Sequence, residues 1–225
     1  MTSLILAGLS FVLLHLVMSS GPIRGPVARK LGGLGFQAAY ALIILASFYW
    51  LVTAWREAPV VLVWQPQQLL RLVPMVIMPI AWILVVAGFT TPNPTSAAPM
   101  PGGMDGSEPV GVTKITRHPV LWGQGLWAVA HLPPNGDQAA IVFFGSFAAL
   151  CLLGMLHIDR RRRARMGAAY RSFEGKTSLL PFAAILQGRT KLRFSEVGLA
   201  RMVASIVLYV GSLHGHAWLT GSSAM

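Results

Sequence analysis

Histidines are the side chains of this sequence best suited to chemistry, because four of the six lie inside or at the edge of long apolar runs. His15 lies inside the first run and His131 near the end of the fourth, while His118 and His157 stand at run boundaries. An ionisable group within an apolar membrane segment is costly and by default marks a functional site with a partner nearby. His15 and His131 therefore suggest a shared ligand, and imidazole is the usual axial ligand of haem iron.

Each histidine also has a simpler interpretation. His118 and His157 fit equally well as boundary residues that bond to water or lipid headgroups. We interpret His214 and His216, near the end of the last run, in that way. For the other two histidines, the alternative is a buried imidazole bonded to a helix carbonyl.

Depth along the helices does not favour the pair His15 and His131. At about 1.5 Å per residue, His15 lies about 8 Å from the end of its run at Ser20, whereas His131 lies about 18 Å from Pro119, where its own run begins. On depth alone, His118 is the easier partner for His15. A hard-cation site is not expected, because none of the seven acidic residues lies within an apolar run.

Six apolar runs must position these side chains. The chain has 225 residues, of which 54% are hydrophobic and 11% charged, a composition far from that of soluble proteins. About 20 apolar residues span a bilayer, and we expect spans at 2–20, 36–55, 69–89, 119–132, 138–157 and 197–214. The fourth run is short, and a re-entrant segment is an alternative for it. The predicted fold is all-α: a polytopic membrane helix bundle of about six transmembrane helices, in a single domain over residues 1–225.

The basic residues alternate between connections. With the fifth connection counted through Arg201, all but two of the 18 Lys and Arg residues fall in the first, third and fifth connections, and the exceptions are Arg56 and Arg71. Cytoplasmic loops are enriched in Lys and Arg, so this pattern predicts that both termini lie on the non-cytoplasmic side. The net charge of +11 is explained by topology and contact with anionic lipid, and it requires no nucleic acid.

Three connecting segments have recognisable character. Residues 91–111 are dense in Pro, Gly and Ser and should be irregular. From Asp159 to Phe173 we expect a helix that continues beyond the membrane, with Met166 and Tyr170 on its apolar face. Residues 181–186 are apolar enough to lie on the membrane surface. The single cysteine, Cys151, is interpreted as a packing residue.

Three sequence blocks resemble the NnrU family of bacterial membrane proteins. They are ITRHPVLWGQGLWAVAHL at Ile115–Leu132, HLVMSSGPIRGPVARKLGGLGFQAAYAL at His15–Leu42, and PFAAILQGRTKL at Pro181–Leu192. The family includes 15-cis-ζ-carotene isomerase, a membrane haem b protein. The resemblance therefore implies a haem b cofactor with His15 and His131 as its axial ligands.

The haem hypothesis gives roles to three further residues. Trp122 and Trp127 would pack the macrocycle, and Arg117 would face a propionate. One departure is clear: the isomerase has a cysteine ligand three residues before its second histidine, where this sequence has Ala128. NnrU proteins are associated with denitrification. The resemblance thus implies a redox or isomerase-like role in the bacterial inner (cytoplasmic) membrane, and leaves open whether the protein is an enzyme.

Two other functions stay open. Arg117, His118 and Pro119, followed by Gly123, resemble the pattern of isoprenylcysteine carboxyl methyltransferases and membrane sterol reductases, which bind a nucleotide cofactor at the cytoplasmic face. The tyrosine expected between the His-Pro pair and the glycine is absent. The third candidate is a cofactor-free accessory protein. Expected partners are the lipid bilayer, an apolar or small gaseous ligand, and denitrification membrane proteins.

Overall fold

The computed structural model describes residues 1–96 and 108–221. The described chain is helical, with no strand and a single isolated bridge between Leu62 and Asp137. Six long helices form the bundle: α1 (Thr2–Ser19), α2 (Gly21–Arg56), α3 (Leu72–Thr90), α4 (Pro119–Asn135), α5 (Gln138–Met166) and α8 (Leu199–Thr220). Five short elements connect them: η1 (Gln68–Arg71), η2 (Gly111–Lys114), α6 (Ala168–Lys176), α7 (Ala183–Leu186) and η3 (Phe194–Glu196).

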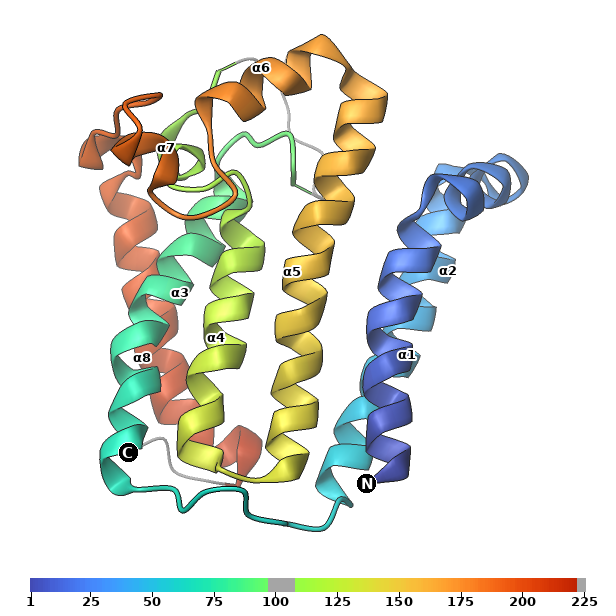
Figure 1. Ribbon diagram of the computed structural model, residues 1–225, viewed down its shortest axis with the longest axis vertical. Helices are drawn as coiled ribbons and strands as arrows, with labels where there is room; N and C mark the ends of the chain where they lie inside the picture. Colours follow the sequence, from blue (N-terminus) through green and yellow to red (C-terminus); the bar gives the residue numbers. More distant parts are fainter. Residues whose placement is uncertain (97–107, 222–225) are drawn as a thin grey trace.

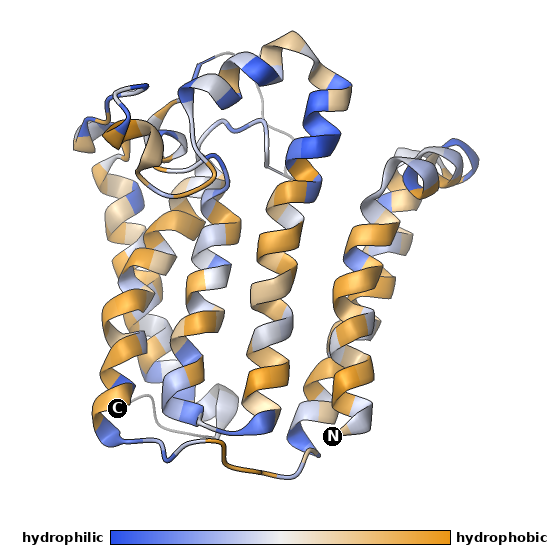
Figure 2. Cartoon of the chain, viewed as in Figure 1, coloured by the Kyte–Doolittle hydropathy of each residue, from blue (hydrophilic) through white to orange (hydrophobic). Residues whose placement is uncertain are grey.

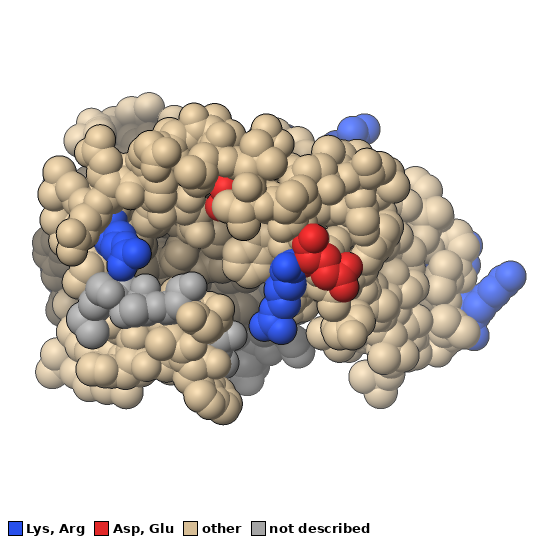
Figure 3. Space-filling view, turned by 90° about the horizontal axis from the view of Figure 1, so that it is seen from below, with Lys and Arg blue, Asp and Glu red and all other residues tan. Residues whose placement is uncertain are grey.

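The long helices run side by side, with the beginning of α1 and the end of α8 at the same end of the bundle (Figure 1). We call this the terminal end. The opposite end, where α1 ends and α4 begins, carries the arginines that follow His157, and we call it the basic end (Figures 1 and 2). Seen from the terminal end, the surface is mostly uncharged (Figure 3).

Apolar side chains cover the outside of the helices as well as the inside. Four segments are long and apolar enough to cross a membrane by length and composition, namely Thr2–Ser19, Gly21–Arg56, Gln68–Thr90 and Gln138–Met166. Along them, large apolar side chains such as Leu9 and Leu42 are more than half exposed, as lipid contact requires. The expected class, an all-helical membrane protein, is therefore confirmed. The count of six spans and the orientation stay predictions.

The short fourth run forms one continuous helix, α4. Pro119 occupies its first turn, where a missing N–H costs nothing, and the helix continues through Pro133 and Pro134 to Asn135. It runs from the basic end to the terminal end without turning back (Figure 1), an arrangement that favours a single pass over a re-entrant segment. Gly136, in the left-handed conformation with φ 70°, then ends the helix.

The helices differ from the sequence prediction at two glycines. Part of the first connection is helical up to Gly32, and a helix that was expected to be continuous is interrupted at Gly167. Gly32, with φ 73°, divides α2, so residues 21–31 of the basic first connection are helical and turn away from the bundle (Figure 1). Gly167, with φ 57°, ends α5, and α6 starts in a new direction. The expected single helix from Asp159 to Phe173 is therefore wrong. Residues other than glycine rarely adopt such positive φ values.

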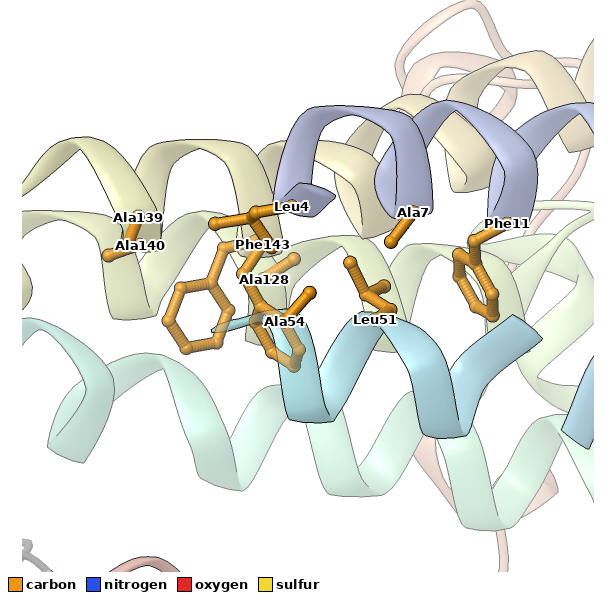
Figure 4. Close-up of a cluster of buried hydrophobic side chains, with 10 residues drawn as sticks. Leu4, Ala7, Phe11, Leu51, Ala54, Ala128, Ala139, Ala140 and Phe143 are labelled. Carbon is orange, nitrogen blue, oxygen red and sulfur yellow. The ribbon is translucent and has the colours of Figure 1, made fainter. Parts of the chain in front are cut away.

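Two features describe how the helices pack: a cluster of buried apolar side chains and a close contact between α3 and α4. Buried residues of α1, α2, α4 and α5, among them Leu4, Phe11, Leu51 and Phe143, form the main cluster (Figure 4). Helices α3 and α4 touch through glycine: a Cβ placed on Gly123 would lie 2.6 Å from the backbone oxygen of Ala81. Small residues allow backbones in a membrane to approach this closely.

The segment expected to be irregular falls partly outside the described residues. Residues 97–107 are not described, while residues 91–96 are irregular, as predicted, and all of them except Pro92 are buried. The Thr95 hydroxyl lies 2.6 Å from the Arg117 carbonyl oxygen and 2.8 Å from Oδ1 of Asn93. This part of the connection is therefore fixed against the start of α4.

Candidate functional site

The His131 imidazole is held on α4 by its own helix. Its Nδ1 lies 2.7 Å from the carbonyl oxygen of Trp127, one turn earlier. A carbonyl only accepts hydrogen bonds, so Nδ1 carries the proton and Nε2 keeps its lone pair. Rings of Trp127 and Phe144 pack against the imidazole at centroid distances of 5.6 and 5.3 Å. In this tautomer Nε2 is the ring nitrogen with a lone pair for a metal ion.

A cavity of about 520 Å³ opens beside His131. That volume lies within the range of small-molecule sites, about 300–1,000 Å³. Its walls combine aromatic and methionine side chains with a few polar groups: Trp55, Arg71, Pro74, Met75, Met78, Trp82, Trp127, His131, Pro134, Asn135, Phe143, Phe144, Tyr209, Ser212, Leu213, His216 and Thr220. Most of these residues come from α3, α4, α5 and α8, with Trp55 from α2 and Arg71 from η1.

His216 shares this cavity, although the sequence indicated only a boundary residue. Its ring, on α8, lies 6.4 Å from that of His131 between centroids, with an angle of 14° between the planes. Its Nδ1 is 3.2 Å from Oγ1 of Thr220. His214, two residues earlier, is exposed and does not line the cavity. The interpretation of His216 as a residue that meets only water or headgroups is therefore wrong.

His15 stands elsewhere in the bundle. Its Nδ1 lies 2.8 Å from the Phe11 carbonyl oxygen, which leaves Nε2 as the atom with a lone pair. Its ring contacts Phe11 and Tyr40, at 4.6 and 6.2 Å, and does not line the cavity.

The two predicted haem ligands lie toward opposite ends of their helices. His15 is four residues before the end of α1, near the basic end, and His131 is four residues before the end of α4, near the terminal end. The ring of Phe147 contacts Phe11, which packs on His15, at 5.0 Å and Trp127, which packs on His131, at 5.1 Å. The structure therefore does not bring His15 and His131 together.

A second cluster surrounds Asp159 at the basic end. Oδ1 of Asp159 accepts hydrogen bonds from Nε2 of His118 and from the Tyr170 hydroxyl, both at 2.6 Å. Oδ2 accepts from Nε and a terminal nitrogen of Arg117, at 2.9 and 2.6 Å. Asp159, His118 and Tyr170 are at most 2% exposed. The carboxylate thus ties together the start of α4, the end of α5 and α6.

Burial and charge act in opposite directions on this carboxylate, which lies beyond the apolar part of α5. Burial alone would raise the pKa of Asp159, but the hydrogen bonds from His118 and Arg117 outweigh it and hold that pKa well below its ordinary value. Burial and the neighbouring carboxylate raise the pKa of Tyr170, so its hydroxyl stays a donor. The cluster is a saturated ion network, which stabilises structure and offers no unoccupied acceptor to a substrate.

This arrangement places Arg117, His118 and Trp122 away from the cavity. Arg117 and His118 point to Asp159, and the Trp122 indole donates to the Leu179 carbonyl oxygen at 2.8 Å. A shallow surface cavity of about 600 Å³ does border Arg117, together with Glu174, Gly175, Thr177, Ser178, Leu179, Leu180, Ala183 and Arg189. Of the predicted site residues, only His131 and Trp127 line the cavity of about 520 Å³.

Sequence reasoning missed Asp159. One signal could have identified it: it is an isolated acid directly before four consecutive arginines, two residues beyond an apolar run. Its partners come from 41 and 11 residues away, so their convergence depends on the fold. Within the described residues, no group of three or more His, Cys, Asp or Glu is arranged to hold a metal ion.

Comparison with known proteins gives a family and a pair of relatives. The family described as NnrU protein matches residues 3–224. The 15-cis-ζ-carotene isomerases of Zea mays and Arabidopsis thaliana are each 34% identical to this chain over 116 residues. Those matches cover 50% of this chain and 32% of each isomerase, so the chain corresponds to only part of those enzymes. No solved structure matches it significantly. With the match extending over nearly its whole length, the chain belongs to the NnrU family.

Proposed function

We propose that this NnrU-family membrane protein binds haem b, with His131 as an iron ligand, in an isomerase-like or redox role. The observation that carries the proposal is the His131 imidazole in the wall of a cavity of about 520 Å³, its Nδ1 bonded to the Trp127 carbonyl oxygen. Histidines that ligate metals almost always donate their second ring N–H to such an acceptor. His15 has the same arrangement on α1.

The residues around His131 fit a large apolar cofactor. Phe143, Phe144 and Trp127 supply aromatic walls, and Met75 and Met78 supply flexible apolar ones. Arg71 also lines the cavity and gives it a positive charge suited to a carboxylate of the cofactor. Bound haem would supply an iron that can change oxidation state and ligation. The protein side chains hold it, orient it and keep water away.

Similarity to the ζ-carotene isomerases supports the isomerase-like role. The relatives' name indicates a polyene substrate, and apolar cavities bury ligands of that kind. Ala128 remains a departure, so a switch of iron ligation through cysteine is not part of this proposal. A link to denitrification and a place in the bacterial inner membrane stay predictions from the resemblance.

The proposal is tested by purification in mild detergent from haem-supplemented cells, followed by absorption spectra of the oxidised and reduced protein. We expect a Soret band in the wild type and in His214→Ala, whose exposed imidazole on α8 is the matched control. His131→Ala should lose most of the haem while still inserting into the membrane. A colourless wild type would refute the proposal.

The structure gives less support to a nucleotide-cofactor enzyme. Arg117 and His118 would have to bind the cofactor, yet both are engaged by the buried carboxylate of Asp159. Thermal stabilisation of the purified protein by S-adenosylmethionine or a nicotinamide nucleotide would favour that alternative. Its absence together with a colourless protein would leave the cofactor-free accessory role.

A further inference from the structure

Four arginines at the basic end form a group that we call the arginine cluster. Its members are Arg24, near the start of α2, and Arg161, Arg162 and Arg165, near the end of α5. With about 3.6 residues per turn, positions 161, 162 and 165 share one side of α5, whereas positions 160 and 163 lie on the other. The part of α2 before Gly32 turns away from the bundle at this same end (Figure 1).

The positive charges of the cluster act on one another and lack a counter-charge. Burial of the Arg161 guanidinium lowers its pKa, and so does repulsion from Arg24, Arg162 and Arg165. Within the described residues, no carboxylate lies within salt-bridge distance of the four side chains. On the other side of α5, by contrast, Nε of Arg163 lies 2.7 Å from Oε2 of Glu174.

Contacts with the protein hold the guanidinium groups but leave donors unused. A terminal nitrogen of Arg161 donates to the Ser19 carbonyl oxygen at 2.9 Å, and one of Arg162 donates to that of Ser96 at 3.0 Å. Nε of Arg162 is buried and has no hydrogen-bond partner in the described part of the chain. A buried donor without an acceptor is costly, so the cluster lacks an acceptor, and its charge favours a negative one.

The depth of the cluster indicates where that acceptor comes from. Ser19 is the last residue of α1, and the apolar run of α5 ends at His157, four residues before Arg161. The cluster therefore lies where an apolar core gives way to headgroups. Arginine matches phosphate oxygens with its planar fork of donors. We propose that the arginine cluster binds the phosphate of an anionic phospholipid.

The surface beside the kink of α2 fits the rest of such a lipid. Leu31 and Leu34 flank Gly32 and are 54% and 84% exposed. Acyl chains would cover them while the phosphate meets the guanidinium groups. Basic sites between membrane helices bind anionic headgroups in this way. The proposal is independent of haem, and it assigns the lipid to four particular arginines instead of to the whole basic surface.

The test is native mass spectrometry of the full chain in mild detergent, with phosphatidylglycerol, phosphatidylcholine or inorganic phosphate added at equal concentration. The bound mass identifies the ligand. Arg161→Gln/Arg162→Gln removes two charges from the cluster, and the control Arg160→Gln/Arg171→Gln removes two charges from exposed arginines outside it. The wild type and the control should retain phosphatidylglycerol in preference to phosphatidylcholine. The cluster variant should bind phosphatidylglycerol about tenfold more weakly or worse.

Arg24→Gln guards against a folding defect in the double variant, because Arg24 lies on the part of α2 that turns away from the bundle. Its contact within the protein is the ring of Phe36, whose centroid is 5.7 Å from the guanidinium carbon. Arg24→Gln should unfold at the wild-type temperature in lipid-free detergent and bind phosphatidylglycerol about fivefold more weakly.

Three outcomes would overturn the proposal. Equal binding of phosphatidylglycerol by the cluster variant and the control would show that attraction is spread over the whole basic end. Equal retention of phosphatidylcholine and phosphatidylglycerol by the wild type would exclude an anionic requirement. Bound inorganic phosphate that displaces phosphatidylglycerol would assign the cluster to a soluble phosphate compound instead of a lipid.

Discussion

The Asp159 carboxylate is deeply buried and accepts hydrogen bonds at both of its oxygens. These two properties determine how much stability the protein should lose when the carboxylate is removed. Its neighbour Arg117 has a side chain only 11% exposed, with one further carboxylate oxygen, from Glu174, at 3.5 Å. Removal of one partner from a buried ion pair leaves a charge without compensation and costs about 3–5 kcal/mol. In an asparagine at this position, the NH2 group is a donor and would face the donors of the residues that now bind the carboxylate.

We therefore expect Asp159→Asn to lower the free energy of unfolding by about 3 kcal/mol. The matched control is Glu108→Gln, which removes an exposed ion pair with Lys176 and should cost at most about 1 kcal/mol. Denaturant unfolding of both variants in the same detergent makes the measurement. Equal stabilities of the two variants would show that the Asp159 network adds nothing.

The same carboxylate predicts a dependence of stability on pH. Its pKa in the folded protein lies below the ordinary value of 3.8, so the unfolded chain takes up a proton first as the pH falls. The stabilisation is therefore complete above about pH 4 and is lost progressively below it. Thermal unfolding at stepped pH between about 5 and 2 should show a steeper decline in the wild type than in Asp159→Asn. Parallel declines in both proteins would exclude Asp159 as the source.

At the scale of helices, the contact between α3 and α4 depends on the absence of a side chain. A Cβ on Gly123 would lie 2.6 Å from the Ala81 oxygen and 3.2 Å from the Val85 nitrogen, which are backbone atoms that cannot rotate away. The helices would have to separate. Because α4 carries His131, such a separation would also disturb the wall of the cavity.

Gly123→Ala should accordingly destabilise the protein by about 1–3 kcal/mol, the usual cost of overpacking. Gly145→Ala is the control: it also lies in a membrane helix, but its new Cβ would have no atom within 4 Å. There the better helix propensity of alanine should leave stability unchanged or slightly higher. Thermal unfolding in detergent compares the two. If Gly123→Ala unfolds at the same temperature as the wild type, the backbones of α3 and α4 are farther apart than described.

The helices could be predicted from sequence to the extent that they are defined by continuous apolar runs. The expected runs 2–20 and 69–89 became α1 (Thr2–Ser19) and α3 (Leu72–Thr90). The breaks at Gly32 and Gly167 could not be predicted, because each depends on a positive φ that glycine permits but does not impose.

The site was less predictable than the helices. His131 could be identified as an ionisable residue in an apolar run, and it lines the cavity with Trp127. Its neighbour His216 comes from a helix 85 positions later, and only the antiparallel arrangement of the intervening segments brings the two rings within 6.4 Å. Asp159 was missed for the same reason, since its partners are gathered by tertiary structure.

For the whole molecule, the charge distribution predicts an orientation. The basic end holds the connections rich in Lys and Arg, and the terminal end holds few charges (Figures 2 and 3). Basic loops are retained in the cytoplasm during insertion, so the terminal end should face away from it. The Arg161 guanidinium donates to the Ser19 carbonyl oxygen at 2.9 Å, which ties the arginine cluster to the end of α1. All basic connections should therefore lie on one side.

Cysteine accessibility tests this orientation, because the chain has a single cysteine, Cys151, which is buried and can be replaced by alanine. In that background, Gln65→Cys adds an exposed thiol at the terminal end and Ala164→Cys an exposed thiol at the basic end. A membrane-impermeant maleimide applied to intact spheroplasts should label only Gln65→Cys, and lysis should make both react. Labelling of Ala164→Cys alone would invert the topology and place the His131 cavity at the cytoplasmic face. In that case, cofactors and ligands would enter the cavity from the cytoplasm.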